Sequence, residues 1–507
     1  MNEIINNTEV KNFIKGSLVR STSLKREVQI YNPALGQVIR KAYVANSVDV
    51  DKAVAVAKEA FVSWSAVPIT KRAKIFFRYL RLLEDDLDTF AKIVSEEHGK
   101  TLEDAHGSIA RGLEVLEFCC GITTHLKSDY SHNVANGVDV YNLRQPLGVC
   151  AGITPFNFPA MVPMWMYPIS IVSGNSFILK PSEKTPSAAI YQAEKLKQAG
   201  LPDGVFNVLI GDKETVDAIL RHPDIEAISF VGSTKVGEYI YKTATAHNKR
   251  AQALCGAKNH LVVMPDADFD KAADALIGAG YGSAGERCMA ISVVVAVGRD
   301  SGDEIVKRLV PKIKNIKVGA YNQSKIDMGP VIDKASFERI NKLIQSGVDD
   351  KAKLVVDGRS LKVAGYEGGY FIGGCLFDQV SVDMQIYQQE IFGPVLCVVR
   401  VDSYQEAIKL INDHEYGNGV AIFTRDGGFA RDFATQIQIG MVGINVPIPV
   451  PVSFHSFGGW KRSIFGSHSI YGMEGVNFYT RLKTVTSRWS TKGTKGVQFS
   501  FQKTTDL

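Results

Sequence analysis

Apolar side chains recur at helical spacing over the first quarter of the chain, after a segment that alternates. Residues 1–45 contain stretches such as Arg-Glu-Val-Gln-Ile-Tyr, in which apolar and polar positions alternate as in a strand. In residues 50–66, 69–97 and 103–126 the apolar positions are three or four apart within densely charged sequence. This pattern predicts an irregular β-rich N-terminal segment followed by three amphipathic helices.

From about residue 147 onward, the apolar positions form short continuous runs instead of periodic ones. Such runs are typical of strands buried on both faces of a parallel sheet, above all where they alternate with helical segments. A second α/β region follows the first, from about residue 261 to 450. The runs include residues 206–211, 227–232, 260–265, 292–298, 352–358, 394–401 and 419–424. We therefore expect an α/β protein built on parallel sheets.

Two other segments are predicted to be strands outside these sheets. Residues 136–149 resemble a pair of strands joined by a Pro-Leu-Gly turn. Residues 476–489 alternate and are rich in β-branched side chains. Because no obvious partner follows the second segment, we expect it to pair with another strand or with another subunit.

The composition narrows the class of protein. With 507 residues, 45% of them hydrophobic and 22% charged, the chain suits a globular protein of two or three domains. A net charge of +5 is small for this length and does not indicate a nucleic-acid partner. Prolines interrupt the apolar stretch 147–179, which makes it a poor membrane span. The N-terminus lacks a secretory signal, and the seven scattered cysteines fit neither a disulfide scaffold nor a metal site, so we expect a cytoplasmic protein.

The candidate nucleophile is Cys288, in the segment Gly-Ser-Ala-Gly-Glu-Arg-Cys-Met-Ala of residues 282–290. The thiolate is the reactive form of cysteine, and a cation such as the adjacent Arg287 lowers a cysteine pKa. Small residues before it allow backbone and ligand to approach closely. The alternative is that Cys288 is a small buried hydrophobe, as free cysteines often are.

A candidate phosphate site follows the run 227–232. Gly232 ends this predicted strand, and Gly237 lies in the helix expected to follow. A glycine turn at a helix N-terminus favours an anion such as a dinucleotide phosphate. The spacing is neither the usual Gly-x-Gly-x-x-Gly nor a P-loop, so this motif is weak by itself.

Five motifs together resemble the aldehyde dehydrogenase superfamily. They are Thr-Pro-Phe-Asn-Phe-Pro (154–159), Lys-Pro-Ser-Glu-Lys-Thr-Pro (180–186), Phe-Val-Gly-Ser-Thr-Lys-Val-Gly (230–237), Gly-Glu-Arg-Cys (285–288) and Glu-Ile-Phe-Gly-Pro-Val (390–395). The resemblance covers about residues 25 to 490, and within the superfamily it points to the CoA-acylating methylmalonate-semialdehyde dehydrogenase branch.

This resemblance implies an architecture. It implies a Rossmann-type NAD-binding domain in residues 1–135 and 150–260, and an α/β catalytic domain in 261–460. It further implies a small β oligomerisation arm in 136–149 and 475–507 that joins a homodimer or homotetramer through the strands near residues 140 and 485.

The resemblance also implies which residues bind NAD. Lys180 and Glu183 match the pair that holds the adenosine ribose hydroxyls, and a carboxylate there favours NAD over NADP. Glu390 matches the ligand of the nicotinamide ribose. The complete set implied for the cofactor is Thr154, Phe156, Lys180, Glu183, Lys184, Ser233, Cys255 and Glu390.

For the chemistry, the resemblance implies covalent catalysis by Cys288. The side-chain amide of Asn157 and the backbone N–H of Cys288 are the implied donors to the oxyanion. Hydrolytic members carry a glutamate base upstream of the cysteine, but Leu254 stands at that position here, and leucine cannot accept a proton. Coenzyme A is therefore the implied acyl acceptor.

The implied substrates are methylmalonate semialdehyde and malonate semialdehyde, which would yield propionyl-CoA or acetyl-CoA with loss of CO2. Arg111 and Arg287 are the candidate ligands of the substrate carboxylate, because a guanidinium matches a carboxylate with two hydrogen bonds. Two alternatives stay open. One is a hydrolytic enzyme with another base, such as Glu286, and the other is a binding protein on the same fold.

Overall fold

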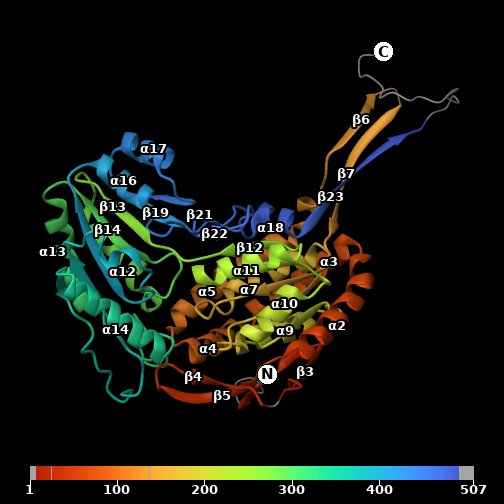
Figure 1. Ribbon diagram of the computed structural model, residues 1–507, viewed down its shortest axis with the longest axis horizontal. Helices are drawn as coiled ribbons and strands as arrows, with labels where there is room; N and C mark the ends of the chain where they lie inside the picture. The colour runs from red at the N-terminus through yellow and green to blue at the C-terminus, as the bar shows by residue number, and fades with distance from the viewer. Residues whose placement is uncertain (1–6, 24, 136, 490–507) are drawn as a thin grey trace.

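The computed structural model describes residues 7–23, 25–135 and 137–489. Figure 1 shows two α/β halves side by side and a narrow arm that projects from one of them. The chain therefore has the predicted α/β architecture, with parallel sheets in both halves. Among the described residues, no helix combines the length and the apolar composition needed to cross a bilayer.

The first half is built on a sheet with the strand order β22-β12-β11-β8-β9-β10-β2-β3. Its central strands run parallel, as their continuous apolar sequences predict: β12 (Arg250–Leu254), β11 (Ile225–Val231), β8 (Val149–Ile153), β9 (Ser176–Lys180) and β10 (Phe206–Val208). The antiparallel strands β22 (Ile464–Phe465), β2 (Asn12–Ile14) and β3 (Ser17–Val19) complete its two sides.

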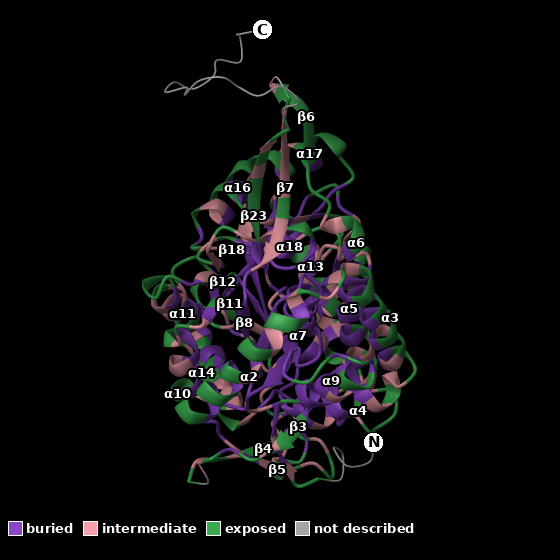
Figure 2. Ribbon diagram, turned by 90° about the vertical axis from the view of Figure 1, so that its right-hand side faces the viewer, coloured by how far each residue is buried: buried purple, intermediate pink, exposed green. Residues whose placement is uncertain are grey.

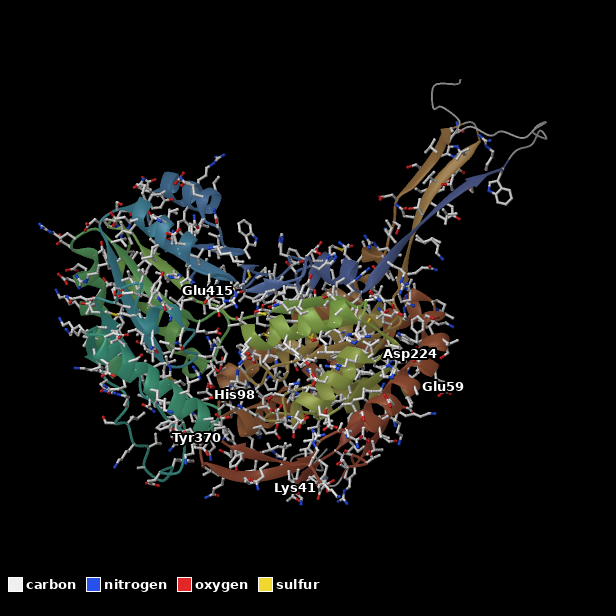
Figure 3. The ribbon with its side chains drawn as sticks, in the orientation of Figure 1. Lys41, Glu59, His98, Asp224, Tyr370 and Glu415 are labelled. Carbon is white, nitrogen blue, oxygen red and sulfur yellow. The ribbon has the colours of Figure 1, made fainter. Side chains whose placement is uncertain are left out.

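The helices of this half pack on the sheet or on one another, and together they keep its apolar side chains buried (Figure 2). They are α2 (Ser47–Ser65), α3 (Ile69–Glu84), α4 (Leu87–His98), α5 (Leu102–Cys120), α6 (Ile122–His125), α7 (Met161–Met164), α8 (Tyr167–Val172), α9 (Ser187–Gln198), α10 (Lys213–Arg221) and α11 (Thr234–Ala246). The N-terminal segment adds a small sheet of β1 (Glu9–Val10), β5 (Gln37–Tyr43) and β4 (Glu27–Asn32). This small sheet lies at the lower edge of the molecule in Figure 3, where Lys41 of β5 is labelled.

The second half has the strand order β15-β16-β17-β14-β13-β19-β20, parallel except for β15. The strands are β15 (Lys353–Val356), β16 (Cys375–Asp378), β17 (Val395–Val401), β14 (Ile291–Val297), β13 (Asn259–Val263), β19 (Gly419–Phe423) and β20 (Met441–Ile444). Its helices are α12 (Phe269–Tyr281), α13 (Ser301–Lys314), α14 (Lys334–Asp349), α15 (Gln385–Gln388), α16 (Tyr404–Asp413) and α17 (Gly427–Gln436). A short pair, β18 (Tyr416–Gly417) and β21 (Trp460–Lys461), lies beside it.

The arm consists of β6 (Tyr130–Ala135), β7 (Val138–Pro146) and β23 (Thr480–Arg488), with β7 in the middle. Most of its side chains are exposed or half-buried (Figure 2). Residues 1–6, 24, 136 and 490–507 of the predicted domains lie outside the described residues. The division of the chain into those domains stays a prediction.

Three predicted elements differ in the structure. The helix predicted over 69–97 is broken between α3 and α4, because Asp86 turns toward α9 and accepts hydrogen bonds from Tyr191 Oη and Lys195 Nζ at 2.6 and 2.9 Å. The strands predicted in 136–149 are not a pair, since β7 joins the arm whereas β8 joins the large sheet.

The third difference is at the C-terminal end of the described chain. Residues 476–478 finish helix α18 (Gly472–Phe478) instead of beginning the last strand. Val476 and Phe478, two residues apart, are both buried, which is the spacing expected of a strand. Here they belong to a short helix that packs against α8.

Candidate active site

Cys288 follows a tight left-handed turn at the end of α12. Ser283, Ala284 and Gly285 have φ of 54°, 53° and 74°, a region that residues other than glycine rarely adopt. A Cβ on Gly285 would lie 2.2 Å from the backbone oxygen of Gly393, so this position requires glycine. After this turn the chain passes through Cys288 and enters β14 at Ile291.

Two asparagines fix the backbone of Cys288. Asn259 Nδ2, on β13, donates to the Cys288 carbonyl at 2.9 Å, and Asn418 Nδ2 donates to the same oxygen at 3.0 Å. These amides tie the cysteine to the start of the parallel sheet of the second half. Its side chain stays half-buried and open to ligands.

The sulfur lies where two cavities meet. A cavity of about 420 Å³ is bounded by Cys288, α5, the loop before α7 and the segment 448–457. A second cavity, of about 360 Å³, extends from Cys288 toward β11, β12 and Glu390. Because Cys288 lines both, a group bound in either cavity can approach its sulfur.

All twelve residues that the sequence singled out lie on these cavities or on a third one that adjoins them. Arg111 and Arg287 line the 420 Å³ cavity, and Asn157, Cys255 and Glu390 line the 360 Å³ cavity. A cavity of about 750 Å³ shares Phe156 and Ser233 with the latter and is lined further by Thr154, Lys180, Glu183 and Lys184. The fold therefore brings together segments that are far apart in the chain.

The 750 Å³ cavity lies at the carboxyl ends of parallel strands, where α/β sheets bind ligands. Lys180 ends β9, and its Nζ donates to Glu183 at 3.1 Å. Lys184 pairs with Asp333 at 2.6 Å. Ser233 occupies the N-cap of α11, directly after β11, so backbone N–H groups of the helix face this cavity.

Asn157 lies beside residues 282–288, the cysteine loop that carries Cys288. Its Nδ2 donates to the backbone oxygen of Glu286 at 3.0 Å, which uses one of the two amide hydrogens. The side chain is buried and lines the same cavity as Cys288. The second amide hydrogen is thus the one available to a ligand.

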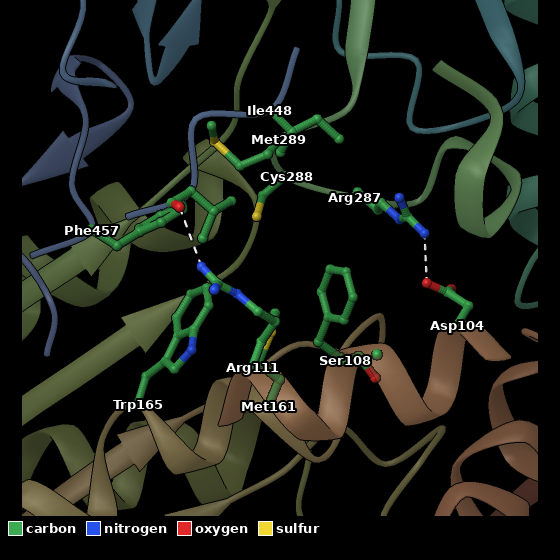
Figure 4. Close-up of a pocket in the computed structure, with 13 residues that line it drawn as sticks. Asp104, Ser108, Arg111, Met161, Trp165, Arg287, Cys288, Met289, Ile448 and Phe457 are labelled. Atoms are coloured by element: carbon green, nitrogen blue, oxygen red, sulfur yellow. Dashed lines mark hydrogen bonds and ion pairs between the residues drawn. The ribbon is translucent and has the colours of Figure 1, made fainter. Parts of the chain in front are cut away.

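The pKa of Cys288 differs from the sequence-based expectation. Burial and, after it, the charge of Glu390 raise it to about 12, and Arg287 is the smallest of the effects that lower it. The cation has little influence because Arg287 Nη2 donates to Asp104 Oδ1 at 2.5 Å, so its charge is compensated (Figure 4). In this state Cys288 is a thiol: Arg287 does lower the pKa, as the sequence predicts, but burial outweighs that effect.

Glu390 is a second titratable group of the 360 Å³ cavity, which Cys255 and Arg339 also line. Burial raises its pKa to about 7, against the opposing effects of the Ala257 N–H and of Lys258. Its Oε1 accepts from Ala257 N at 3.2 Å. At neutral pH a fraction of the molecules therefore carries a carboxylate in the cavity that contains the sulfur.

Two arginines give the 420 Å³ cavity its charge. Arg111, on α5, donates to Glu114 at 2.7 Å and to the carbonyls of Val450 and Pro451 at 3.2 and 3.1 Å. Figure 4 shows its guanidinium below the sulfur of Cys288, whereas Arg287 points the other way, toward Asp104. Sequence reasoning missed Asp104, although its position seven residues before Arg111 places both on one face of a helix.

Leu254 and Glu286 occupy the interior and do not open into either cavity at Cys288. Leu254 ends β12 and belongs to the hydrophobic core. The Glu286 carboxyl is buried, accepts from Ile332 N at 3.2 Å and lies 3.9 Å from His98 Nε2. His98, labelled in Figure 3, is itself buried at the end of α4. Neither Leu254 nor Glu286 is among the described residues that line the two cavities.

The site thus places Cys288 between two cavities, with residues of the five sequence motifs around them. The sequence model of the aldehyde dehydrogenase family matches residues 18–485. The chain belongs to the aldehyde dehydrogenase family.

Relatives within this family are similar over nearly the whole chain. A malonate-semialdehyde dehydrogenase of Pseudomonas aeruginosa is 54% identical over 96% of this chain and 98% of its own length. A mitochondrial, acylating methylmalonate-semialdehyde dehydrogenase of Arabidopsis thaliana is 49% identical over 95% of this chain and 79% of its own length.

Solved structures show the same likeness. A Sinorhizobium meliloti protein assigned as a methylmalonate-semialdehyde dehydrogenase, complexed with NAD, is 55% identical with a TM-score of 0.94, covering 96% of this chain and 98% of that one. Betaine aldehyde dehydrogenase of Staphylococcus aureus, in complex with NAD⁺, is 27% identical with a TM-score of 0.91, covering 97% of this chain and 98% of that one. The second structure thus has the same fold with about half the sequence identity of the first.

Proposed function

We propose that this enzyme oxidises malonate semialdehyde and methylmalonate semialdehyde with NAD and transfers the acyl group to coenzyme A. The products are acetyl-CoA or propionyl-CoA, CO2 and NADH. The observation that carries the proposal is the 420 Å³ cavity, which holds Arg111 and Arg287 on the walls that also expose Cys288. Relatives named for malonate and methylmalonate semialdehyde support the same substrates.

The semialdehyde carboxylate explains the two arginines. It lies two bonds from the aldehyde carbon, so a substrate that reaches the sulfur places its charge within the same cavity. A guanidinium binds such a carboxylate with two charge-assisted hydrogen bonds. The aromatic and aliphatic walls, which include Phe158, Trp165 and Phe457, exclude water and strengthen this attraction.

The covalent step belongs to Cys288. Its thiol loses the proton to solvent, and the resulting thiolate attacks the aldehyde carbon and forms a thiohemiacetal. The second Nδ2 hydrogen of Asn157, together with the Cys288 N–H, stabilises the oxyanion. The aldehyde carbon then loses a hydride and becomes a thioester of Cys288. The bond from the neighbouring carbon to the carboxylate breaks with release of CO2, and that carbon takes up a proton.

The residues at the other two cavities fit NAD, which supplies the hydride acceptor when it is bound. Ser233 and the N-terminus of α11 suit the pyrophosphate, and Glu183, oriented by Lys180, suits free ribose hydroxyls. Lys184 is engaged by Asp333, so its charge is not free for a 2′-phosphate. These contacts favour NAD over NADP, with Thr154, Phe156, Cys255 and Glu390 as the remaining contacts.

Leu254 supports transfer of the acyl group to a thiol. A hydrocarbon buried at the position of the hydrolytic glutamate cannot activate water. The thiol of coenzyme A loses its proton to solvent and its thiolate attacks the thioester carbonyl. The bond to Cys288 breaks, and the departing Cys288 thiolate takes a proton from solvent. The word acylating in the name of the Arabidopsis relative is consistent with this step.

A hydrolytic enzyme that releases a free acid is the alternative, and one observation favours it. Glu390 shares the cavity of Cys288, and burial raises its pKa to about 7, a value suited to a general base. Glu286 does not support this alternative, because its carboxyl opens into neither cavity.

The decisive experiment is product analysis of the purified enzyme with malonate semialdehyde and NAD, with and without coenzyme A. We expect a burst of about one NADH per subunit without coenzyme A, and steady turnover to acetyl-CoA only with it. Cys288→Ala serves as the control without a nucleophile and is expected to give no burst. Steady turnover to free acid without coenzyme A would reject the proposal, and its loss in Glu390→Gln would then identify Glu390 as the base.

For the assembly, we propose a homodimer or homotetramer held together by the arm. The support is the outer strand β23, which pairs, within the described part of the chain, with β7 on one side only. Such an edge offers unpaired backbone groups to a neighbouring subunit.

A further inference from the structure

Asp104 lies on the wall of the 420 Å³ cavity and contacts Arg287 directly. It belongs to the first turn of α5, where the side chain of the N-cap Thr101 accepts from the Asp104 N–H. Its Oδ1 accepts from Arg287 Nη2 at 2.5 Å (Figure 4). This contact joins α5 of the first half to the cysteine loop of the second.

A buried lysine compensates the charge of Asp104. Lys100 is fully buried, with its Nζ 3.5 Å from Asp104 Oδ2 and 4.1 Å from the centre of the Phe158 ring. Burial alone would raise the pKa of Asp104, but Lys100 and Arg287 outweigh it and hold that pKa well below its usual range. Asp104 is therefore an anion with a cation on each side.

The guanidinium of Arg287 also rests on a glycine. A Cβ on Gly282 would lie 2.5 Å from Nη1 and 2.8 Å from Nη2 of Arg287, so the guanidinium packs against this residue. Asp104 holds the end of the group while Gly282 supports its face. A long flexible side chain is thereby kept in one orientation, which removes rotamer freedom before a ligand binds.

The charges of this wall favour an incoming anion. Asp104 lies between Lys100 and Arg287, and Glu114 pairs with Arg111, so three positive charges stand against two negative ones. Asp104 uses one N–H of a guanidinium that has five. A substrate carboxylate can therefore bind Arg287 without displacing Asp104.

We infer that Asp104 is a positioning residue for recognition of the substrate carboxylate, and that it acts through Arg287. This inference rests on the proposed semialdehyde substrate. It assigns Asp104 a role in selecting acidic aldehydes over neutral ones, and no role in the reaction at the sulfur.

The test is a comparison of malonate semialdehyde with propanal, which lacks the carboxylate, at saturating NAD and coenzyme A. In Asp104→Asn we expect kcat/KM for malonate semialdehyde to fall roughly tenfold through a higher KM, with propanal changed less than about twofold. Glu103→Gln is the matched control, because it removes an exposed carboxylate from the same helical turn. We expect this control to leave both substrates unchanged.

A double-mutant cycle separates positioning from general damage. If Asp104 acts through Arg287, then Asp104→Asn added to Arg287→Leu should cause almost no further loss. Should Asp104→Asn alone leave Lys100 uncompensated and the protein unfolded, the double variant Lys100→Met with Asp104→Asn removes both buried charges and undergoes the same assays.

The outcomes are distinct. Equal losses on both substrates, an unchanged or lower KM for malonate semialdehyde, or an additive cycle would each overturn the inference and leave the proposed function intact. If the wild-type enzyme shows no preference for malonate semialdehyde over propanal, the proposed substrate fails and the inference fails with it.

Discussion

Burial has a stronger effect on the reactive cysteine than the charge of its sequence neighbour. The residue before Cys288 is an arginine, yet the pKa of the thiol is raised to about 12, because desolvation and Glu390 outweigh a guanidinium that is already paired. The thiol of the ligand-free enzyme is therefore expected to react slowly.

The effect of Glu390 on the pKa of Cys288 can be measured through the reactivity of the thiol. Its pKa is near 7, so above pH 7 its negative charge raises the pKa of Cys288, and below pH 7 protonation removes that effect. We expect Glu390→Gln to accelerate alkylation of Cys288 by iodoacetamide about threefold to tenfold at pH 8.5. The same variant should differ little from the wild type at pH 6.

The measurement is the alkylation rate as a function of pH, with the labelled site identified by peptide mass. Cys288→Ser provides the background from the other cysteines. A wild-type rate that already reaches a plateau near pH 7 would show that the thiol is not suppressed in the way described.

At the scale of elements, the turn between α12 and β14 determines where the nucleophile lies. Gly285 has a left-handed backbone and contacts the Gly393 carbonyl, whereas Gly278, on α12 itself, has open space where a Cβ would be. A methyl group would therefore clash with the backbone at position 285 but would fit at position 278, although the two glycines belong to the same segment.

Gly285→Ala is expected to lower the free energy of unfolding by about 2 kcal/mol or more and to abolish the NADH burst, because the turn must shift. Gly278→Ala should retain activity and keep or raise stability, since alanine favours a helix interior by about 1 kcal/mol over glycine. Thermal unfolding and burst amplitude measure both variants. Full activity of Gly285→Ala would contradict the role given to the turn.

At the scale of the whole molecule, the arm carries exposed apolar side chains away from the two halves. Leu482, on β23, is 54% exposed, although leucine usually avoids water. If the arm joins subunits, Leu482→Glu should shift the enzyme toward smaller assemblies at micromolar concentration.

The measurement for the arm is light scattering coupled to size-exclusion chromatography. Lys483→Glu, at the next position of the same strand, is the control for added negative charge. An unchanged mass for Leu482→Glu would place the interface elsewhere.

The sequence by itself determined the α/β class and most of the strands, because continuous apolar runs are local properties of the chain. It also named the twelve candidate residues, through motifs that resemble those of the aldehyde dehydrogenase superfamily. It failed where a local pattern has two solutions. The spacing of Val476 and Phe478 suits a strand as well as a short helix, and packing against α8 selects the helix.

Only the tertiary structure decided the electrostatic state of the site. Arg287 and Asp104 are 183 positions apart, and their contact determines how much charge Cys288 experiences. Burial of Cys288, Glu390 and Lys100 likewise depends on neighbours from both halves of the molecule. Desolvation and ion pairing act through space, so residue order can name the reactive groups but cannot give their charges.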